Sequence, residues 1–329
     1  MALSGQALCK KFMAENGVFS FSCDAAPCLG SRSVSGPSWA SILTGRGPAE
    51  HRVVSNEPKD DMDHVSAPSL CKLLAPSRSA LVLSTSWAGF EQIMQPSEAQ
   101  DAVHRFPLDG KDVSKWKAST QEATEALKRN LGGGAEAPSE ADRAHGVEEP
   151  PATLVIAYYD IVDEVGHNYG FGPHIDAYAD AVAFAAGECA QVLAAVEARV
   201  SSSGEEWLVG VLSDHGGSIT AGVKCLCPKL FASFSTDRLT GEQVKYQGCH
   251  GIELLPSHRY VFGGFLHLGG TGRKRTREGL IAAAQCKKAV DYEGMTSLDV
   301  VPTILDFLGV ERPSEGLPGR NLFAPVLEI

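Results

Sequence analysis

Short apolar runs rich in β-branched residues alternate along the chain with longer segments of helical periodicity. The runs at 79–84, 154–159, 208–212 and 260–266 predict strands, and because they are apolar on both faces we expect them to be buried within a sheet. Helical periodicity predicts helices at roughly 3–15, 39–45, 67–74, 114–130, 175–200 and 297–308. This alternation is typical of an α/β protein with a mostly parallel sheet covered by helices.

The pattern is interrupted between Gly132 and Pro151, where the sequence reads GGGAEAPSEADRAHGVEEPP. Glycine, proline and acidic side chains cannot bury apolar surface, so this segment predicts a mobile surface loop. The strands on both sides have the character of one sheet. We therefore interpret the segment as a flexible insertion at about 131–151 in a single domain spanning residues 1–329, rather than as a domain boundary.

Composition and charge narrow the class of protein. The 329 residues are 43% hydrophobic and 21% charged, which is ordinary for a soluble globular chain. The net charge of −11 argues against binding to nucleic acid. No run approaches the roughly 18 apolar residues of a membrane helix, and the first residues show no signal peptide, so neither feature is expected. Nine cysteines without CxxC spacing indicate no particular chemistry, and compartment and oligomeric state stay open.

Polar residues with metal-binding chemistry follow two of the predicted strands. Asp163 and His167 come after the strand at 154–159 and are spaced i, i+4, which places both on one side of a helical turn. Asp214 and His215 follow the next strand directly. Ligands bind at the carboxyl ends of strands in open α/β sheets. Taken alone, either pair also fits an ordinary solvated turn.

A fifth candidate is His250, which lies between small residues in the segment GCHG. A single histidine of this kind is more often without a special role. Together, however, the five residues supply two carboxylates and three imidazoles, a ligand set that suits zinc better than calcium or magnesium.

The segment SVSGPSWASILTG offers a nucleophile. Pro37 can occupy the first turn of a helix, the residues WASIL have helical periodicity, and Gly45 can end the helix. Ser35 is then placed at a helix N-terminus, where free N–H groups favour an anion. The alternative is that Ser35 only caps the helix.

These motifs, in this order, resemble the alkaline phosphatase superfamily and most closely its nucleotide pyrophosphatase and type I phosphodiesterase branch. SGPSWASILTG has that branch's spacing of nucleophile, proline and Thr-Gly, which places Ser35 at the nucleophile position. YYDIVDEVGHNYG and LSDHGG resemble the two metal-binding segments, CHG the late histidine, and SLDVVPTIL the C-terminal helix. Asn56 matches the asparagine that holds a phosphate oxygen, although Arg52 replaces the usual glycine after His51.

The resemblance implies a fold and a mechanism. The fold is an alkaline-phosphatase-like three-layer sandwich, and the cofactors are two divalent metal ions, expected to be zinc. Asp163, His167 and His250 would form the first metal site, and Asp214, His215 and Ser35 the second. A metal-dependent hydrolase of small phosphoric esters, acting as a phosphodiesterase, nucleotide pyrophosphatase or phosphomonoesterase through a phosphoserine intermediate, is expected.

Two departures from the family pattern leave alternatives open. The family begins with an apolar strand whose final Asp ligates the second metal, whereas this chain starts at what resembles the following helix. The domain is therefore expected to be N-terminally incomplete, or the protein a catalytically impaired member that acts as a binding protein. Sulfatases carry Arg where this chain has Trp39, which weakens but does not remove the alternative of a sulfatase. A phosphotransferase of the same superfamily is a further alternative.

Overall fold

The computed structural model describes residues 19–22, 35–56, 62–75, 81–96, 102–106, 108, 112–131, 154–203, 207–215, 218–219, 235–236, 243–244, 248–249, 263–271 and 297–321. Its helices are α2 (Ser35–Thr44), α3 (Pro48–His51), α4 (Leu70–Leu74), α5 (Ala88–Met94), α6 (Val113–Leu131), α8 (Ile161–Tyr169), α9 (Asp176–Ser203) and α11 (Val300–Leu308), with the 3-10 helix η4 (Ser297–Asp299) directly before α11. Its strands are β1 (Phe19–Ser22), β2 (Leu81–Thr85), β3 (Ala102–Arg105), β4 (Leu154–Ala157), β5 (Trp207–Leu212), β6 (Ser218–Ile219), β7 (Ser235–Thr236), β8 (Gln243–Val244), β9 (Gly248–Cys249) and β10 (Gly263–Thr271).

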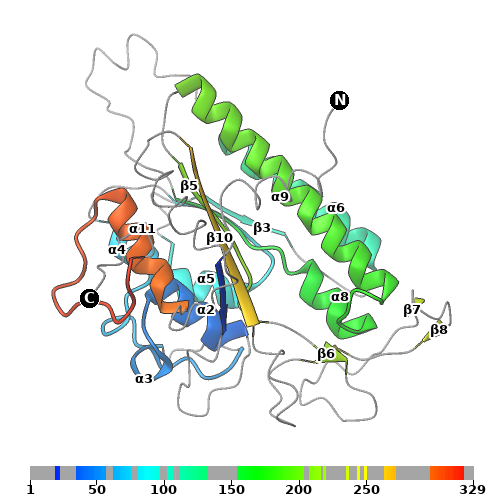
Figure 1. The fold of residues 1–329 in the computed structure, drawn as a ribbon, viewed down its shortest axis with the longest axis horizontal. Coiled ribbons are helices and arrows are strands. Elements are labelled where there is room, and N and C mark those ends of the chain that lie inside the picture. The colour runs from blue at the N-terminus through cyan, green and yellow to red at the C-terminus, as the bar shows by residue number, and fades with distance from the viewer. Residues whose placement is uncertain are drawn as a thin grey trace.

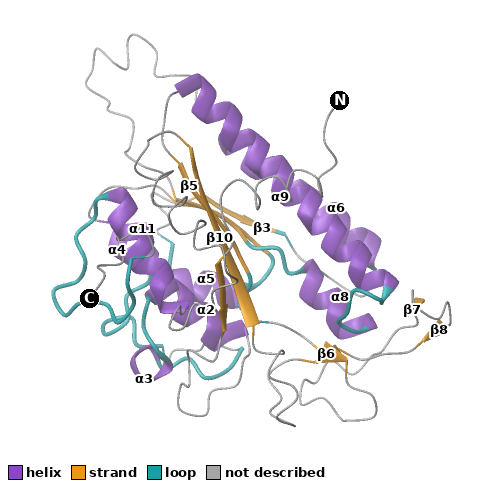
Figure 2. Ribbon diagram, in the orientation of Figure 1, coloured by secondary structure: helices purple, strands orange, loops and turns teal. Residues whose placement is uncertain are grey.

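The longer strands form two three-stranded sheets. One has the order β3-β2-β4 with both pairings parallel, and the other has the order β1-β10-β5 with both pairings antiparallel. Helices lie on either side of the strands, with α6, α8 and α9 on one side and α2, α4, α5 and α11 on the other (Figures 1 and 2). The result is an α/β arrangement. A mostly parallel sheet is seen in the described residues only around β2.

Most predicted elements are present with shifted ends. The helices at 67–74, 114–130, 175–200 and 297–308 are confirmed within a few residues as α4, α6, α9, and η4 with α11. Strand β4 ends at Ala157, two residues earlier than predicted, and β10 extends to Thr271. The helix predicted at 3–15 and the insertion at about 131–151, apart from the last residue of α6, lie outside the described residues.

The prediction that the strands are fully buried is wrong for β4, whose residues are half-buried. Strand β4 pairs with β2 on one side, and among the described strands it has no neighbour on the other. A strand at the end of a sheet keeps more of its surface exposed than one with neighbours on both sides. The apolar residues on both faces of β4 therefore predicted more burial than this strand has in the described part of the fold.

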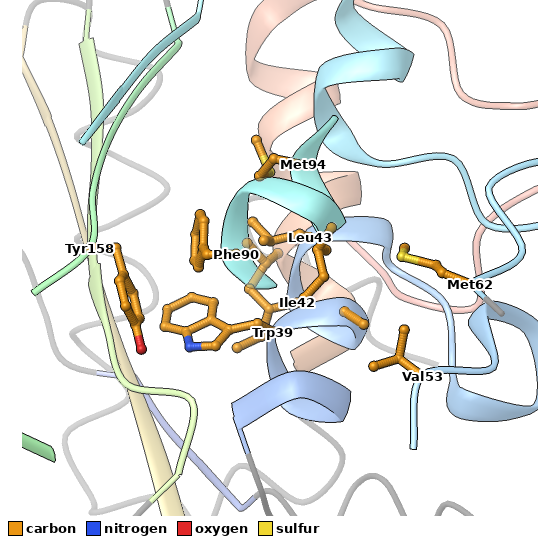
Figure 3. Close-up of a cluster of buried hydrophobic side chains, with 11 residues drawn as sticks. Trp39, Ile42, Leu43, Val53, Met62, Phe90, Met94 and Tyr158 are labelled. Carbon is orange, nitrogen blue, oxygen red and sulfur yellow. The ribbon is translucent and has the colours of Figure 1, made fainter. Parts of the chain in front are cut away.

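Three buried clusters hold the helices in place. The largest joins α2 and α5 to the end of β4 through Trp39, Ile42, Phe90 and Tyr158 (Figure 3). A second lies between α6, α8 and α9, and a third between α4 and α11. Burial of apolar surface stabilises by about 25 cal/mol per Å². The first cluster therefore fixes α2, the helix that carries Ser35, against the strand that leads to Asp163.

Helix α9 is the one described helix that is long and apolar enough to cross a membrane by length and composition, over Asp176–Ser202. Only 33% of its most apolar window is buried. The same test is passed by core helices of soluble proteins, and α9 packs against α6 through the apolar cluster that also includes α8. The expectation that the chain has no membrane segment therefore stays a prediction.

Candidate active site

Ser35 is the first residue of α2 and is buried, with 8% of its surface exposed. The helix begins one turn earlier than its apolar periodicity predicted, because Pro37 is tolerated in the first turn, where backbone N–H groups have no intrahelical partner. It ends as predicted at Gly45, whose φ of +67° is in the left-handed region that favours glycine. The sequence around Ser35 therefore places its hydroxyl at the beginning of a helix with defined ends.

Asn56 is held against the start of α2 by close backbone packing. A Cβ added to Gly36 would lie 1.9 Å from the carbonyl oxygen of Ser55, so this approach requires glycine. The Gly36 N–H donates to Asn56 Oδ1 over 2.8 Å. We expected the helix N–H groups to bind a phosphoryl oxygen, but this one is used by Asn56. Because the Asn56 side-chain oxygen accepts this bond, it is the amide NH2 group of Asn56 that can donate a hydrogen bond to a ligand.

Asp163 and His167 lie on α8 with the geometry that their spacing predicts. The His167 Nε2 lies 3.2 Å from Asp163 Oδ2. His167 is buried, and its ring makes an edge contact with Phe171 at 5.6 Å between centroids. Gly166 permits this contact, because a Cβ there would lie 2.2 Å from the Phe171 ring. Gly166 and Phe171 thus fix the orientation of the His167 imidazole.

Asp214 and His215 follow β5, as the sequence indicated. The His215 Nε2 lies 3.3 Å from Asp214 Oδ2, and His215 is buried. The Ser213 hydroxyl donates to the His215 carbonyl oxygen over 2.7 Å, which makes the turn after the strand rigid. The second Asp–His pair is therefore positioned by the strand end.

The segment after β5 meets the start of α2 at the serine. Ser35 Oγ lies 3.1 Å from His215 Nε2, although 180 residues separate them in sequence. Burial raises the pKa of Asp214, and the negative charge of Asp163 raises it further, whereas backbone N–H groups and the Ser35 hydroxyl act in the opposite direction. The two carboxylates, from α8 and from the end of β5, are therefore close enough to repel each other.

Tyr158 is a member of this site that the sequence did not reveal, since we assigned it to a strand. It directly follows β4, is buried, and its hydroxyl donates to Asp160 Oδ1 over 3.0 Å. Burial raises the pKa of Tyr158, and so do the charges of Asp160, Asp214 and Asp163. A polar aromatic residue at the carboxyl end of a strand was the signal that could have identified it.

Partly buried carboxylates that repel each other, with buried imidazoles beside them, fit a divalent cation. The described oxygen and nitrogen donors are of the kinds that zinc accepts. In the described ranges, however, no three His, Cys, Asp or Glu side chains are grouped so that they could hold a metal ion. His250, the predicted third ligand of the first site, lies outside those ranges.

More than half of the chain matches a known protein family in sequence. The sequence model of the type I phosphodiesterase / nucleotide pyrophosphatase family matches residues 76–243. The chain belongs to this family. The match includes both Asp–His pairs, and the alkaline phosphatase superfamily indicated by the sequence is thereby confirmed. No curated protein matches the chain in sequence. Members of the family generally depend on divalent metal ions and act on phosphate esters.

Solved structures support the fold of this family member. BT1596, a 2-O GAG sulfatase, superposes with a TM-score of 0.56 at 14% identity, over 96% of this chain and 67% of that chain. Murine ectonucleotide pyrophosphatase / phosphodiesterase 5, as an inactive variant in complex with AMP, superposes with a TM-score of 0.55 at 11% identity, over 95% of this chain and 91% of that chain. Both have alkaline-phosphatase-like α/β folds.

Proposed function

We propose that the protein is a hydrolase of phosphoric esters in which Ser35 is the nucleophile. The observation that carries the proposal is the 3.1 Å separation between Ser35 Oγ and His215 Nε2, which brings the start of α2 to the Asp–His pair at the end of β5. The family match supports the same class of reaction.

The residues have distinct roles in the proposed reaction. The deprotonated Ser35 oxygen attacks phosphorus in line, the alcohol leaves, and a phosphoseryl ester forms that water then hydrolyses. The Asn56 amide donates to a non-bridging phosphoryl oxygen and stabilises the negative charge of the transition state. Burial of Ser35 and His215 keeps bulk water away from the nucleophile.

Two zinc ions are the proposed cofactors. Asp163, His167 and His250 would hold the first, and Asp214, His215 and Ser35 the second. Bound divalent ions would supply positive charge that lowers the pKa of the serine hydroxyl and stabilises the leaving oxygen.

We further propose that residues 1–329 form a single domain, an alkaline-phosphatase-like three-layer sandwich, with a flexible insertion at about 131–151. The helices on both sides of the strands support this architecture (Figure 2). The two described sheets would then be parts of one central layer.

Nucleotides and their diesters are the proposed substrates, supported by the AMP complex of the murine phosphodiesterase. Sulfate esters are the second candidate, since a sulfatase has a similar fold. Trp39 favours the phosphoric ester, because sulfatases carry Arg at this position.

The test is Ser35→Ala, compared with the wild type in the presence of zinc. We expect hydrolysis of bis(4-nitrophenyl) phosphate to be lost, because no hydroxyl remains to form the phosphoseryl ester, while the zinc ion of the first site, which does not involve Ser35, is retained. The control is Ser201→Ala, which removes a serine hydroxyl at an exposed position near the end of α9. This variant should keep full activity. Unchanged turnover in Ser35→Ala contradicts the assignment. Preferential hydrolysis of 4-nitrophenyl sulfate by the wild type would favour the second candidate.

A further inference from the structure

Trp39 contributes a buried hydrogen-bond donor beside the candidate active site. The side chain is 8% exposed, and its Nε1–H has no hydrogen-bond partner among the described residues. A buried indole N–H usually finds a partner, because leaving it unpaired costs about 1–3 kcal/mol. The position therefore favours a ligand that supplies the missing acceptor.

The helix directs this donor toward the nucleophile. Trp39 lies four residues after Ser35 on α2, so both residues are on the same face of the helix. Helical side chains tilt toward the N-terminus and cover the preceding turn. The indole of Trp39 is therefore expected on the side of α2 that carries Ser35.

Aromatic neighbours fix the indole in place. The Trp39 ring makes edge contacts with Phe90, at 5.0 Å between centroids, and with Tyr158, at 5.5 Å. In Figure 3 the indole nitrogen of Trp39 and the hydroxyl of Tyr158 lie at the same edge of the cluster. That hydroxyl donates a hydrogen bond to Asp160 and is close enough to Asp163 and Asp214 to interact with their charges. The nitrogen therefore faces the acidic side of the site rather than the apolar core.

We propose that the Trp39 indole N–H contacts the substrate and donates a hydrogen bond to an anionic oxygen of the phosphoryl group that Ser35 attacks. This inference rests on the proposed function. An indole N–H can donate a hydrogen bond but cannot accept one, so its partner must be an acceptor, and the phosphoryl oxygens of the proposed substrate are acceptors of this kind. Because aromatic neighbours hold the ring in place, such a donor needs no reorganisation when the negative charge develops.

The direct test observes the indole N–H itself. The chain has four tryptophans, so protein labelled with 15N-tryptophan and loaded with zinc gives four indole signals, and Trp39→Phe identifies the one from Trp39. When inorganic phosphate is added, we expect the Trp39 proton signal to move downfield. Trp87 is the matched control, because its ring also lies beside Tyr158, at 6.2 Å, and its signal should move much less.

Calorimetry of phosphate binding distinguishes a failure of this inference from a failure of the proposed function. If phosphate binds and the Trp39 signal stays in place, the inference is overturned while the proposed function stands. An upfield signal that ignores phosphate would show that the N–H points at the Tyr158 ring instead. If phosphate does not bind the zinc-loaded wild type, the proposed function and this inference both fall.

An activity measurement distinguishes donation from packing. Site-specific replacement of Trp39 by 3-benzothienylalanine exchanges the N–H for sulfur and keeps the ring volume. We expect kcat/KM for bis(4-nitrophenyl) phosphate to fall about tenfold or more, the equivalent of one lost hydrogen bond to a charged group. Trp87→Phe should stay within about twofold of the wild type. Loss of activity in Trp39→Phe but not in the benzothienyl protein would overturn the inference, because packing alone would then explain it.

Discussion

His51 is fully buried against α2, and its two ring nitrogens have different partners. The Val53 backbone N–H donates to Nδ1 over 3.0 Å, so the proton of the neutral ring is on Nε2 and faces Ser41 Oγ at 3.0 Å. Protonation of His51 would place a second ring proton on Nδ1, where it would point at the Val53 N–H and lose this hydrogen bond. Burial lowers the pKa of His51 from 6.5 to about 4, and this geometry acts in the same direction.

The buried His51 predicts a loss of stability in weak acid. Because the folded-state pKa lies below the unfolded value, the unfolded chain binds more protons between pH 6.5 and pH 4, and stability falls as the pH falls through this window. Between pH 7 and pH 5 the contribution lost is about 2 kcal/mol. Urea unfolding of the wild type and of His51→Asn at both pH values measures it, since the variant should lose about 2 kcal/mol less. Equal losses in the two proteins would show that His51 is not the cause.

At the scale of elements, two helical glycines make opposite predictions for the same substitution. A Cβ at Gly36 would lie 1.9 Å from the Ser55 carbonyl oxygen, whereas a Cβ at Gly187, in the middle of α9, meets nothing within 4 Å. Gly36→Ala should move Ser55 and Asn56 away from α2 and lower both stability and activity, by more than about 1 kcal/mol in unfolding free energy. Gly187→Ala should instead stabilise the protein by about 0.5–1 kcal/mol and leave activity unchanged.

Thermal unfolding and hydrolysis of bis(4-nitrophenyl) phosphate, measured on both variants, check this pair. Because each variant gains the same methyl group in a helix, helix propensity alone cannot explain opposite changes in the free energy of unfolding. If Gly36→Ala were as stable and as active as the wild type, the loop at 55–56 would not depend on the close approach to α2.

The elements were predictable where one face of a helix is continuously apolar, as in α6 and α11. They were less predictable at the ends. The beginning of α2 was placed too late, because Ser35 and Gly36 carry no apolar signal and are held by contacts with residues about 20 and 180 positions away. Likewise, β4 was predicted to include Tyr158, because an aromatic residue after an apolar run has the same pattern whether the strand continues or the chain turns into a polar site.

At the scale of the whole molecule, the site contains segments that are far apart in the sequence. Only the order of the motifs along the chain indicated that these segments belong to one site. Spacing predicts that Asp163 faces His167, because a helix fixes that geometry locally. The approach of Asp214 to Ser35 depends on how β5 and α2 are packed. The pattern of apolar residues does not specify such packing, and for this reason the resemblance to a family was needed to bring the two segments together.

This long-range assembly is costly without a cation. Asp214 and Asp163 are close enough that their charges repel, and at neutral pH the folded protein either retains the repulsion or takes up a proton, both of which cost free energy. Asp214→Asn keeps the shape of the side chain and removes the charge. In the presence of a chelator we expect this variant to unfold at a higher temperature than the wild type, by about 2 °C for each kcal/mol relieved.

The sign should reverse when zinc is present. A cation that binds only the folded state stabilises it in proportion to the logarithm of its concentration over Kd, and Asp214→Asn weakens that binding. Zinc should therefore raise the midpoint of the wild type more than that of the variant. Glu122→Gln, at an exposed position on α6, removes a charge that belongs to none of the proposed ligands and should show neither effect. A variant that is less stable than the wild type under chelation would mean that the carboxylates are accommodated without a cation, and the metal-dependent mechanism would lose its physical basis.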